Sequence, residues 1–210
     1  MVFPLRGVIL LPRSSFPLNV FEPRYMALVN DALAGERLIG FVQPLAGEGD
    51  AESPDGKNVA LRGTGGAGRL IAWQEGDDGR YLITLNGVSR FTLGQEEETS
   101  APYRIFKVDW SHFADDLIQG HGEEAVDRTR LLSVLKEYLR VNNLSADWEG
   151  ISNSSNELLV NTLSMISPYG PEEKQALLEA GDLKTRAEVL VTLAEMELAG
   201  SDGASGSTLQ

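Results

Sequence analysis

A glycine-rich stretch, Gly63-Thr64-Gly65-Gly66-Ala67-Gly68, comes nearest in this sequence to a chemical motif. It matches G-x-G-x-x-G, which binds a dinucleotide when a strand precedes it and a helix follows, because the pyrophosphate then lies at the helix N-terminus. Here the next residues, Arg69–Trp73, have the pattern of a strand, and Ile83 stands where an acidic residue would bind the ribose. We therefore expect a loop that enters a strand, not a nucleotide site.

A metal site would have to come from His112, Asp115, Asp116 and His121, which lie close together in the chain. Two histidines with carboxylates can bind zinc, but the composition of this segment favours a solvated linker. The chain has no cysteine, which excludes disulfides, thiolate metal sites and cysteine nucleophiles. Neither a phosphate-binding G-x-x-x-x-G-K-[ST] nor a G-x-S-x-G elbow occurs. The sequence therefore predicts no enzyme, no cofactor and no metal.

Acidic residues outnumber basic ones, 31 to 18 over 210 residues, and the net charge is −13. The excess is concentrated in residues 106–210, where 18 acidic and 8 basic residues give −10. An acidic chain repels a phosphate backbone, so general nucleic-acid binding is disfavoured. RNA binding stays an alternative only through four arginines of the first half that could converge: Arg62, Arg69, Arg80 and Arg90.

Residues 1–110 contain short apolar runs bounded by glycine or proline, a pattern that is typical of strands. Gly76-Asp77-Asp78-Gly79 predicts a hairpin turn, and Asn86-Gly87 predicts another turn. Residues 45–58 form an acidic Gly/Ser/Pro loop that we expect to be mobile. The expected strands are Val8–Leu11, Phe16–Val20, Leu38–Val42, Arg69–Trp73, Tyr81–Leu85, Ser89–Leu93 and Tyr103–Trp110.

One helix interrupts the strands, beginning near Pro23 and ending at Gly35. Residues 111–122 carry no periodic pattern and are expected to be a linker. Helices follow over 123–142, after a cap at Ser154 or Ser155, from Pro171, and over Leu183–Leu198. The Gly/Ser-rich residues 199–210 predict a disordered tail.

Three segments now carry a resemblance. They are Phe3-Pro4-Leu5 with Val8-Ile9-Leu10-Leu11-Pro12, then Pro17-Leu18-Asn19-Val20-Phe21-Glu22-Pro23-Arg24-Tyr25, and Glu173-Lys174-Gln175-Ala176-Leu177-Leu178-Glu179 followed by Asp182 and Arg186. Together with Gly63-Thr64, Asp78-Gly79-Arg80 and Gly87-Val88-Ser89-Arg90-Phe91, they resemble the Lon N-terminal (substrate-binding) domain family over most of residues 3–198. The sequence departs from the family in the glycines at 65–68 and the loop at 45–58.

The resemblance implies an α+β fold: a PUA-like β pseudo-barrel with one inserted helix over 1–110, then a C-terminal helical bundle over 123–198. It implies a stand-alone substrate-binding domain without the ATPase and peptidase modules. It carries over no catalytic residue. Its signature residues Phe21, Glu22, Pro23, Arg24 and Tyr25 are expected to be structural.

The leading hypothesis is a non-enzymatic module that binds unfolded or damaged polypeptides through exposed apolar segments, as an adaptor to a protease or chaperone. The peptide-binding candidates are Leu10, Leu11, Phe16 and Phe21. Two alternatives stay open: RNA binding by a PUA-like fold, and an unrecognised enzyme with a pocket of converging polar groups. The start lacks the features of a signal peptide, and no apolar stretch reaches the ~18 residues of a membrane span, so we expect a soluble cytoplasmic protein.

Tyr25 provides a first test of the helix assignment. It shares a face with Leu28, Val29, Ala32 and Leu33, and this face must cover the sheet. Tyr25→Ala is therefore expected to cost about 3–5 kcal/mol of unfolding free energy, and Tyr25→Phe only ~1 kcal/mol. Equilibrium denaturation measures both. A Tyr25→Ala protein within ~0.5 kcal/mol of the parent would show that the ring lies on the surface.

Overall fold

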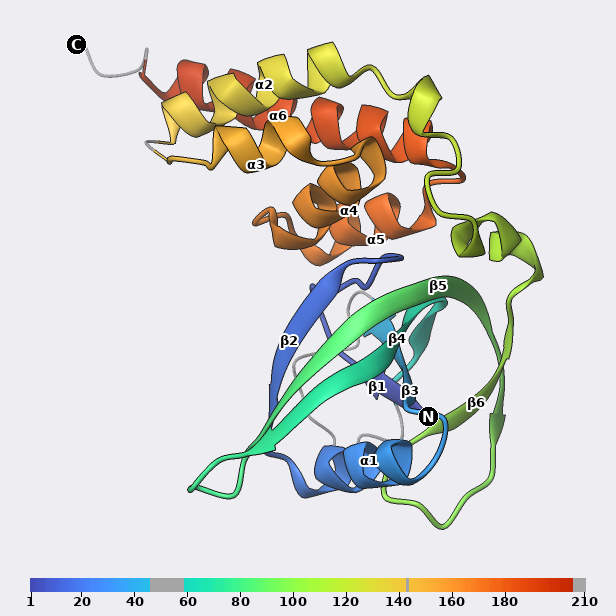
Figure 1. Cartoon of the computed structure of the whole chain (residues 1–210). Coiled ribbons are helices and arrows are strands. Elements are labelled where there is room, and N and C mark those ends of the chain that lie inside the picture. The colour runs from blue at the N-terminus through green and yellow to red at the C-terminus, as the bar shows by residue number, and fades with distance from the viewer. Residues whose placement is uncertain (46–58, 143, 206–210) are drawn as a thin grey trace.

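The structure, a computed structural model, describes residues 1–45, 59–142 and 144–205, with side chains to residue 200. Its fold class is α+β, as expected. A β region and a helical region are stacked end to end (Figure 1). Most of the loop expected to be mobile, residues 46–58, lies outside the described residues.

The β region is one six-stranded sheet in the order β1-β3-β4-β5-β2, with β6 paired to β5. β1 and β3 are parallel, whereas the other pairs are antiparallel. An isolated bridge joins Val2 of β1 to Arg104, just before β6. The strands are β1 (Val2–Pro4), β2 (Ser15–Val20), β3 (Leu38–Pro44), β4 (Leu61–Glu75), β5 (Tyr81–Glu97) and β6 (Ile105–Asp109).

β4 and β5 form one long hairpin, and the predicted turn at residues 76–79 is confirmed. Gly79 has φ +76°, which a glycine adopts without strain. Two expectations were wrong here. The G-x-G-x-x-G stretch lies inside β4, not in a loop, and Asn86-Gly87 lies inside β5, where a register shift replaces the expected turn.

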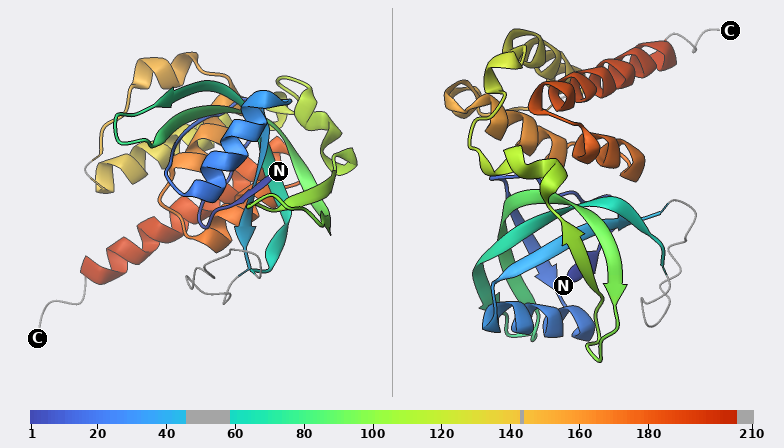
Figure 2. Two further views of the ribbon diagram at one scale, coloured as in Figure 1. Left: turned by 90° about the horizontal axis from the view of Figure 1, so that it is seen from below. Right: turned by 90° about the vertical axis from the view of Figure 1, so that its right-hand side faces the viewer.

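Helix α1 (Pro23–Ala34) agrees with the prediction and covers the end of the sheet that faces away from the other helices (Figures 1 and 2). Tyr25 is 7% exposed and stacks on Phe3 with the ring centroids 3.8 Å apart. Leu28, Val29 and Ala32 are fully buried in the same cluster. The apolar face of this helix therefore completes the core of the β region.

The helical region begins after β6 and lies at the opposite end from α1 (Figure 2). Ser155 caps α4 by accepting a hydrogen bond from the Leu158 amide. The last helix continues past the expected end at Leu198, into the residues predicted to be a disordered tail. The helices are η1 (Ser111–Leu117), η2 (Glu123–Ala125), α2 (Arg128–Val141), α3 (Trp148–Asn153), α4 (Asn156–Ile166), α5 (Pro171–Glu179) and α6 (Leu183–Ser205).

The segment Ile9–Leu11 joins the two regions and is not the strand that its sequence predicts. Leu10 packs into the core of the β region, whereas Ile9 and Leu11 pack into the core of the helices. The segment lies directly on the sheet because two glycines leave space for it. A Cβ atom on Gly66 would stand 2.0 Å from the Leu10 carbonyl oxygen, and one on Gly87 would stand 1.9 Å from the Leu11 oxygen.

A buried ion pair between Arg90 and Asp116 fixes the second connection between the regions. Arg90 in β5 donates through Nε and Nη2 to the Asp116 carboxylate at 2.9 and 2.8 Å, and through Nη1 to the carbonyls of Leu178 and Ala180. Asp116 belongs to η1, within the segment expected to be a solvated linker, yet it is only 8% exposed. Burial alone would raise the pKa of Asp116, but the hydrogen bonds and charge of Arg90 lower it.

Removing one partner of this pair is expected to be costly, because the other charge stays buried. Asp116→Ala should lower the unfolding free energy by about 3–5 kcal/mol in urea titrations. The matched control is its exposed neighbour, Asp115→Ala, which should stay within ~0.5 kcal/mol of the parent. Equal effects of the two variants would contradict the buried pair.

The ion pair between Arg90 and Asp116 also predicts that the free energy of unfolding falls in acid. The pKa of Asp116 is lower in the folded protein than in the unfolded chain. The pair therefore stabilises the fold fully at any pH above the pKa that Asp116 has in the unfolded chain. This stabilisation is lost as the pH falls toward the pKa that Asp116 has in the folded protein. Below pH ~4, the parent should therefore lose stability more steeply than Asp116→Ala.

Candidate functional site

Two of the four residues expected to contact a peptide are core residues. Leu10 is 1% exposed and Leu11 is 0% exposed, so neither offers surface to a ligand, and this expectation is corrected. Phe16 is half-buried and meets the Phe41 ring edge-on, with the centroids 5.8 Å apart. Only Phe21 is well exposed, at 61%, and the Arg80 guanidinium lies over its ring.

The signature residues at the start of α1 hold that helix in place. The Arg24 Nε donates to the Glu22 carboxylate at 2.9 Å, and its guanidinium lies 4.7 Å from the centroid of the Tyr25 ring. Pro23 occupies the first turn, where a missing amide proton costs nothing. The structural role that the sequence predicts for the whole set, in which Phe21 is exposed, stays a prediction.

The residues considered for zinc do not assemble into a site. His121 lies 3.6 Å from Asp115, whereas Asp116 is occupied by Arg90. No group of three or more potential metal ligands occurs among the residues that the structure describes. Within the same residues, no helix is both long and apolar enough to cross a membrane.

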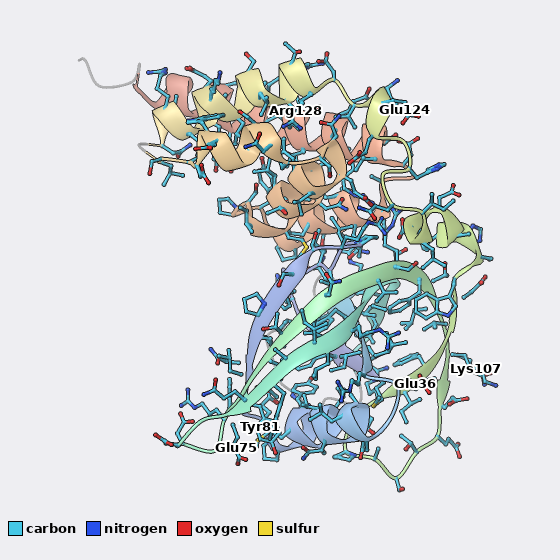
Figure 3. All side chains as sticks on the ribbon, viewed as in Figure 1. Glu36, Glu75, Tyr81, Lys107, Glu124 and Arg128 are labelled. Carbon is cyan, nitrogen blue, oxygen red and sulfur yellow. The ribbon has the colours of Figure 1, made fainter. Side chains whose placement is uncertain are left out.

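The four arginines considered for RNA do not converge on one surface. Arg90 is buried at the junction, and Arg62 reaches across it to Glu172. Arg69 donates to the Glu36 carbonyl, and Arg80 pairs with Asp78 at the hairpin turn. In the helical region, Arg128 likewise points inward and donates to Asn156 and to the Ile151 carbonyl (Figure 3).

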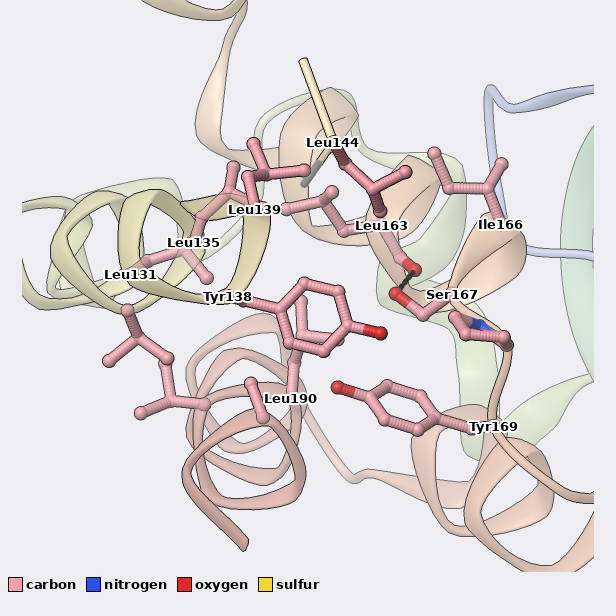
Figure 4. Close-up of a pocket in the computed structure, with 14 residues that line it drawn as sticks. Leu131, Leu135, Tyr138, Leu139, Leu144, Leu163, Ile166, Ser167, Tyr169 and Leu190 are labelled. Atoms are coloured by element: carbon pink, nitrogen blue, oxygen red, sulfur yellow. Dashed lines mark hydrogen bonds between the residues drawn. The ribbon is translucent and has the colours of Figure 1, made fainter. Parts of the chain in front are cut away.

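An apolar cavity of about 190 Å³ lies within the helical region (Figure 4). Its walls come from α2 and the segment after it, from the end of α4 and the turn that follows, and from α6. Two residues at its margin are strongly exposed: Leu144 at 56% and Ile166 at 70%. Because an apolar cavity of roughly 150 Å³ can hold a benzene ring, this one has room for one aromatic or branched side chain. Its lining includes Leu131, Leu135, Leu139, Leu163 and Leu190.

The periodicity of the sequence places these leucines on the apolar faces of helices, but it could not reveal the cavity between them. An apolar helix face that packs against a neighbouring helix and one that is left open show the same spacing of apolar residues in the sequence. The gap depends on how far apart α2, α4 and α6 lie, which is set by their packing. The only local signal is Pro168, which ends α4 and turns the chain so that Tyr169 reaches the cavity.

One end of the cavity is polar. The hydroxyl groups of Tyr138, from α2, and Tyr169, from the turn after α4, point toward each other (Figure 4). The charge of Glu197, an exposed residue of α6, acts on the Tyr138 hydroxyl. Burial, and then the charge of Glu197, raise the pKa of both tyrosines. Both phenols are therefore neutral at physiological pH.

Lys174 in α5 holds the turn that carries Tyr169. Its ammonium group is buried and donates to the carbonyls of Ser164 at 2.9 Å and Met165 at 2.5 Å, which are unpaired at the end of α4. Burial lowers the pKa of Lys174 to about 8. This cation thus fixes where α4 ends and where the wall of the cavity turns.

Comparison with known proteins identifies the family. A family model described as the ATP-dependent protease La (LON) substrate-binding domain matches residues 1–195. The chain belongs to this family. It is 31% identical over 207 residues to a Lon protease of Parabacteroides distasonis and 28% identical over 206 residues to Lon protease 2 of Sorangium cellulosum. These matches cover 93% and 94% of the chain, but it spans only 24% of the length of either relative.

Solved structures of Lon N-terminal domains have the same fold. The Lon N-terminal domain protein from Xanthomonas campestris matches with a TM-score of 0.60 and 19% identity, over 91% of this chain and 95% of that one. The N-terminal domain of Mycobacterium avium complex Lon protease matches with a TM-score of 0.67 and 16% identity, over 92% and 96%. The resemblance seen in the sequence is therefore confirmed.

The buried Lys174 predicts that the stability of this substrate-binding domain changes at alkaline pH. Burial lowers the pKa of Lys174 from its ordinary value of 10.5 to about 8, so the unfolded chain holds more protons between these two pH values. Stability then rises with pH in this window, and the gain is lost as the pH falls back to 8. Relative to Lys174→Met, the parent should gain roughly 2–3 kcal/mol of unfolding free energy between pH 8 and 10. The exposed control Lys184→Met should follow the parent, and parallel curves for all three proteins would contradict a buried ammonium group.

Proposed function

We propose that this chain binds exposed apolar segments of unfolded or damaged polypeptides and catalyses no reaction itself. The observation that carries the proposal is the apolar cavity of the helical region, with Leu144 and Ile166 exposed at its margin. Water solvates such a surface poorly, and a folded partner rarely offers a loose apolar side chain, so an unfolded segment is the ligand that fits. Membership of the Lon substrate-binding family supports this role.

The expected affinity is modest. Burying one large apolar side chain contributes about 1.5–3 kcal/mol, and part of this is offset by ordering the peptide. One site of this kind gives weak, reversible binding that discriminates little between sequences. Such binding suits a module that samples many unfolded chains.

We further propose that the β region is a PUA-like pseudo-barrel and that the helices form the bundle that the resemblance implies. The bridge between Val2 and Arg104, which brings β1 near the start of β6, supports a nearly closed barrel. We propose that the module works in the cytoplasm, for which the absence of cysteine gives modest support, and that it delivers bound chains to a protease or chaperone.

The cavity is tested by placing a charge at its margin. Ile166→Asp is expected to weaken binding of a fluorescent, reduced and carbamidomethylated unfolded protein about tenfold or more, because the carboxylate must be desolvated against apolar walls. Fluorescence anisotropy measures the dissociation constant. The matched control is Leu117→Asp in η1, where the parent residue is similarly exposed at 66% but lies outside the cavity.

Leu117→Asp should bind within about twofold of the parent, since a single surface charge far from the ligand has little effect at moderate salt. Circular dichroism confirms that both variants are folded. Equal binding by Ile166→Asp and the parent would rule out this cavity as the site. No binding by the parent would refute the proposed function.

A further inference from the structure

The polar end of the cavity adds a charge to an otherwise apolar site. Glu197 stands one turn beyond Ala194 on α6, and Ala194 lines the cavity. Residues three apart share a helix face, so the carboxylate lies beside the opening. Its charge acts on the hydroxyl groups of Tyr138 and Tyr169, which face each other (Figure 4).

Three cations of the helical region contact acidic or aromatic side chains. Arg130 pairs with Glu195 at 3.1 Å, and Arg140 pairs with Glu137 at 2.5 Å. The Lys136 ammonium lies over the Trp148 ring. Residues 106–210 carry a net charge of −10, an excess that favours the approach of cationic groups to this half of the chain.

We infer that the cavity selects polypeptide segments in which a lysine or arginine lies two positions from a large apolar residue. The inference rests on the proposed function, because it assigns a sequence preference to the same site. In an extended segment, side chains two positions apart point the same way. The apolar side chain then fills the cavity while the basic one reaches Glu197 and the two phenol oxygens.

A basic side chain fits this end better than a neutral polar one for two reasons. Its aliphatic stem can lie along apolar wall while its charged head stays near water. The head can donate to the carboxylate and to the phenol oxygens, and it can also lie against an aromatic ring. An acidic residue in the same position would meet Glu197 and the negative surroundings, and is therefore rejected.

The test uses three fluorescent peptides of one length, with the cores Phe-Ser-Lys, Phe-Ser-Gln and Phe-Ser-Glu in the same Gly/Ser background. Binding is measured by anisotropy at ~50 mM salt, where screening is weak. We expect the parent to bind the lysine peptide about fivefold more tightly than the glutamine peptide, as a partly exposed ion pair allows, and the glutamate peptide most weakly.

Glu197→Gln should bring the lysine and glutamine peptides within about twofold of each other. The matched control is Glu188→Gln, which removes the same charge from the same helix. Glu188 lies nine residues away, two and a half turns, and so on the opposite side of α6. This control should retain the preference.

The outcomes separate the two proposals. Equal binding of the three peptides by the parent would overturn the preference and leave apolar capture standing. A preference that Glu188→Gln removes as fully as Glu197→Gln would overturn the role of Glu197 in favour of overall charge. No binding of any of the three peptides would overturn both proposals.

Discussion

The close contact between the segment Ile9–Leu11 and two glycines of the sheet is the constraint on which the rest of the structure depends. A side chain at Gly66 or Gly87 would collide with the backbone of Leu10 or Leu11, so the segment can lie on the sheet only at these positions. Alternate side chains then enter opposite cores, Leu10 that of the strands and its neighbours that of the helices. One short segment thereby makes the packing of the two regions interdependent, and the helices acquire a fixed support.

Buried charges make this junction specific as well as stable. Apolar contacts tolerate small shifts, whereas the bidentate pair of Arg90 and Asp116 and the carbonyls of Leu178 and Ala180 require one relative orientation. The arrangement has a cost, because Arg186 is also buried and its Nη2 has no hydrogen-bond partner among the described residues. Burial and the charge of Arg90 both lower the pKa of Arg186, so this charge is tolerated in the junction at the expense of stability.

Much of the fold could be predicted from local chemistry, but the site could not. Pro23, Gly35 and the apolar face of α1 determine that helix, and Gly76–Gly79 determines the hairpin turn, because these signals act within a few residues. The glycines at 65–68 and at 87 predict turns that do not form, since glycine marks both a turn and a close approach of backbones, and only the tertiary contact decides between them. Leu10 and Leu11 are as apolar as a peptide-binding surface would be. Their burial depends on those same distant glycines.

Under the proposed function, the separation between the junction and the cavity would let a ligand bind without disturbing the contacts between the two regions. A cavity left unfilled forfeits the contacts that its lining would otherwise make, which destabilises the helices around it. The cost falls on α2, on α6 and on the end of α4, which Lys174 holds, and not on the packing around Leu10 and Leu11. A ligand side chain that fills the gap restores those contacts without moving the junction. In the proposed site, the affinity would therefore depend on the packing that the free helices lack, and the orientation of the ligand would depend on the polar end that Tyr138, Tyr169 and Glu197 provide.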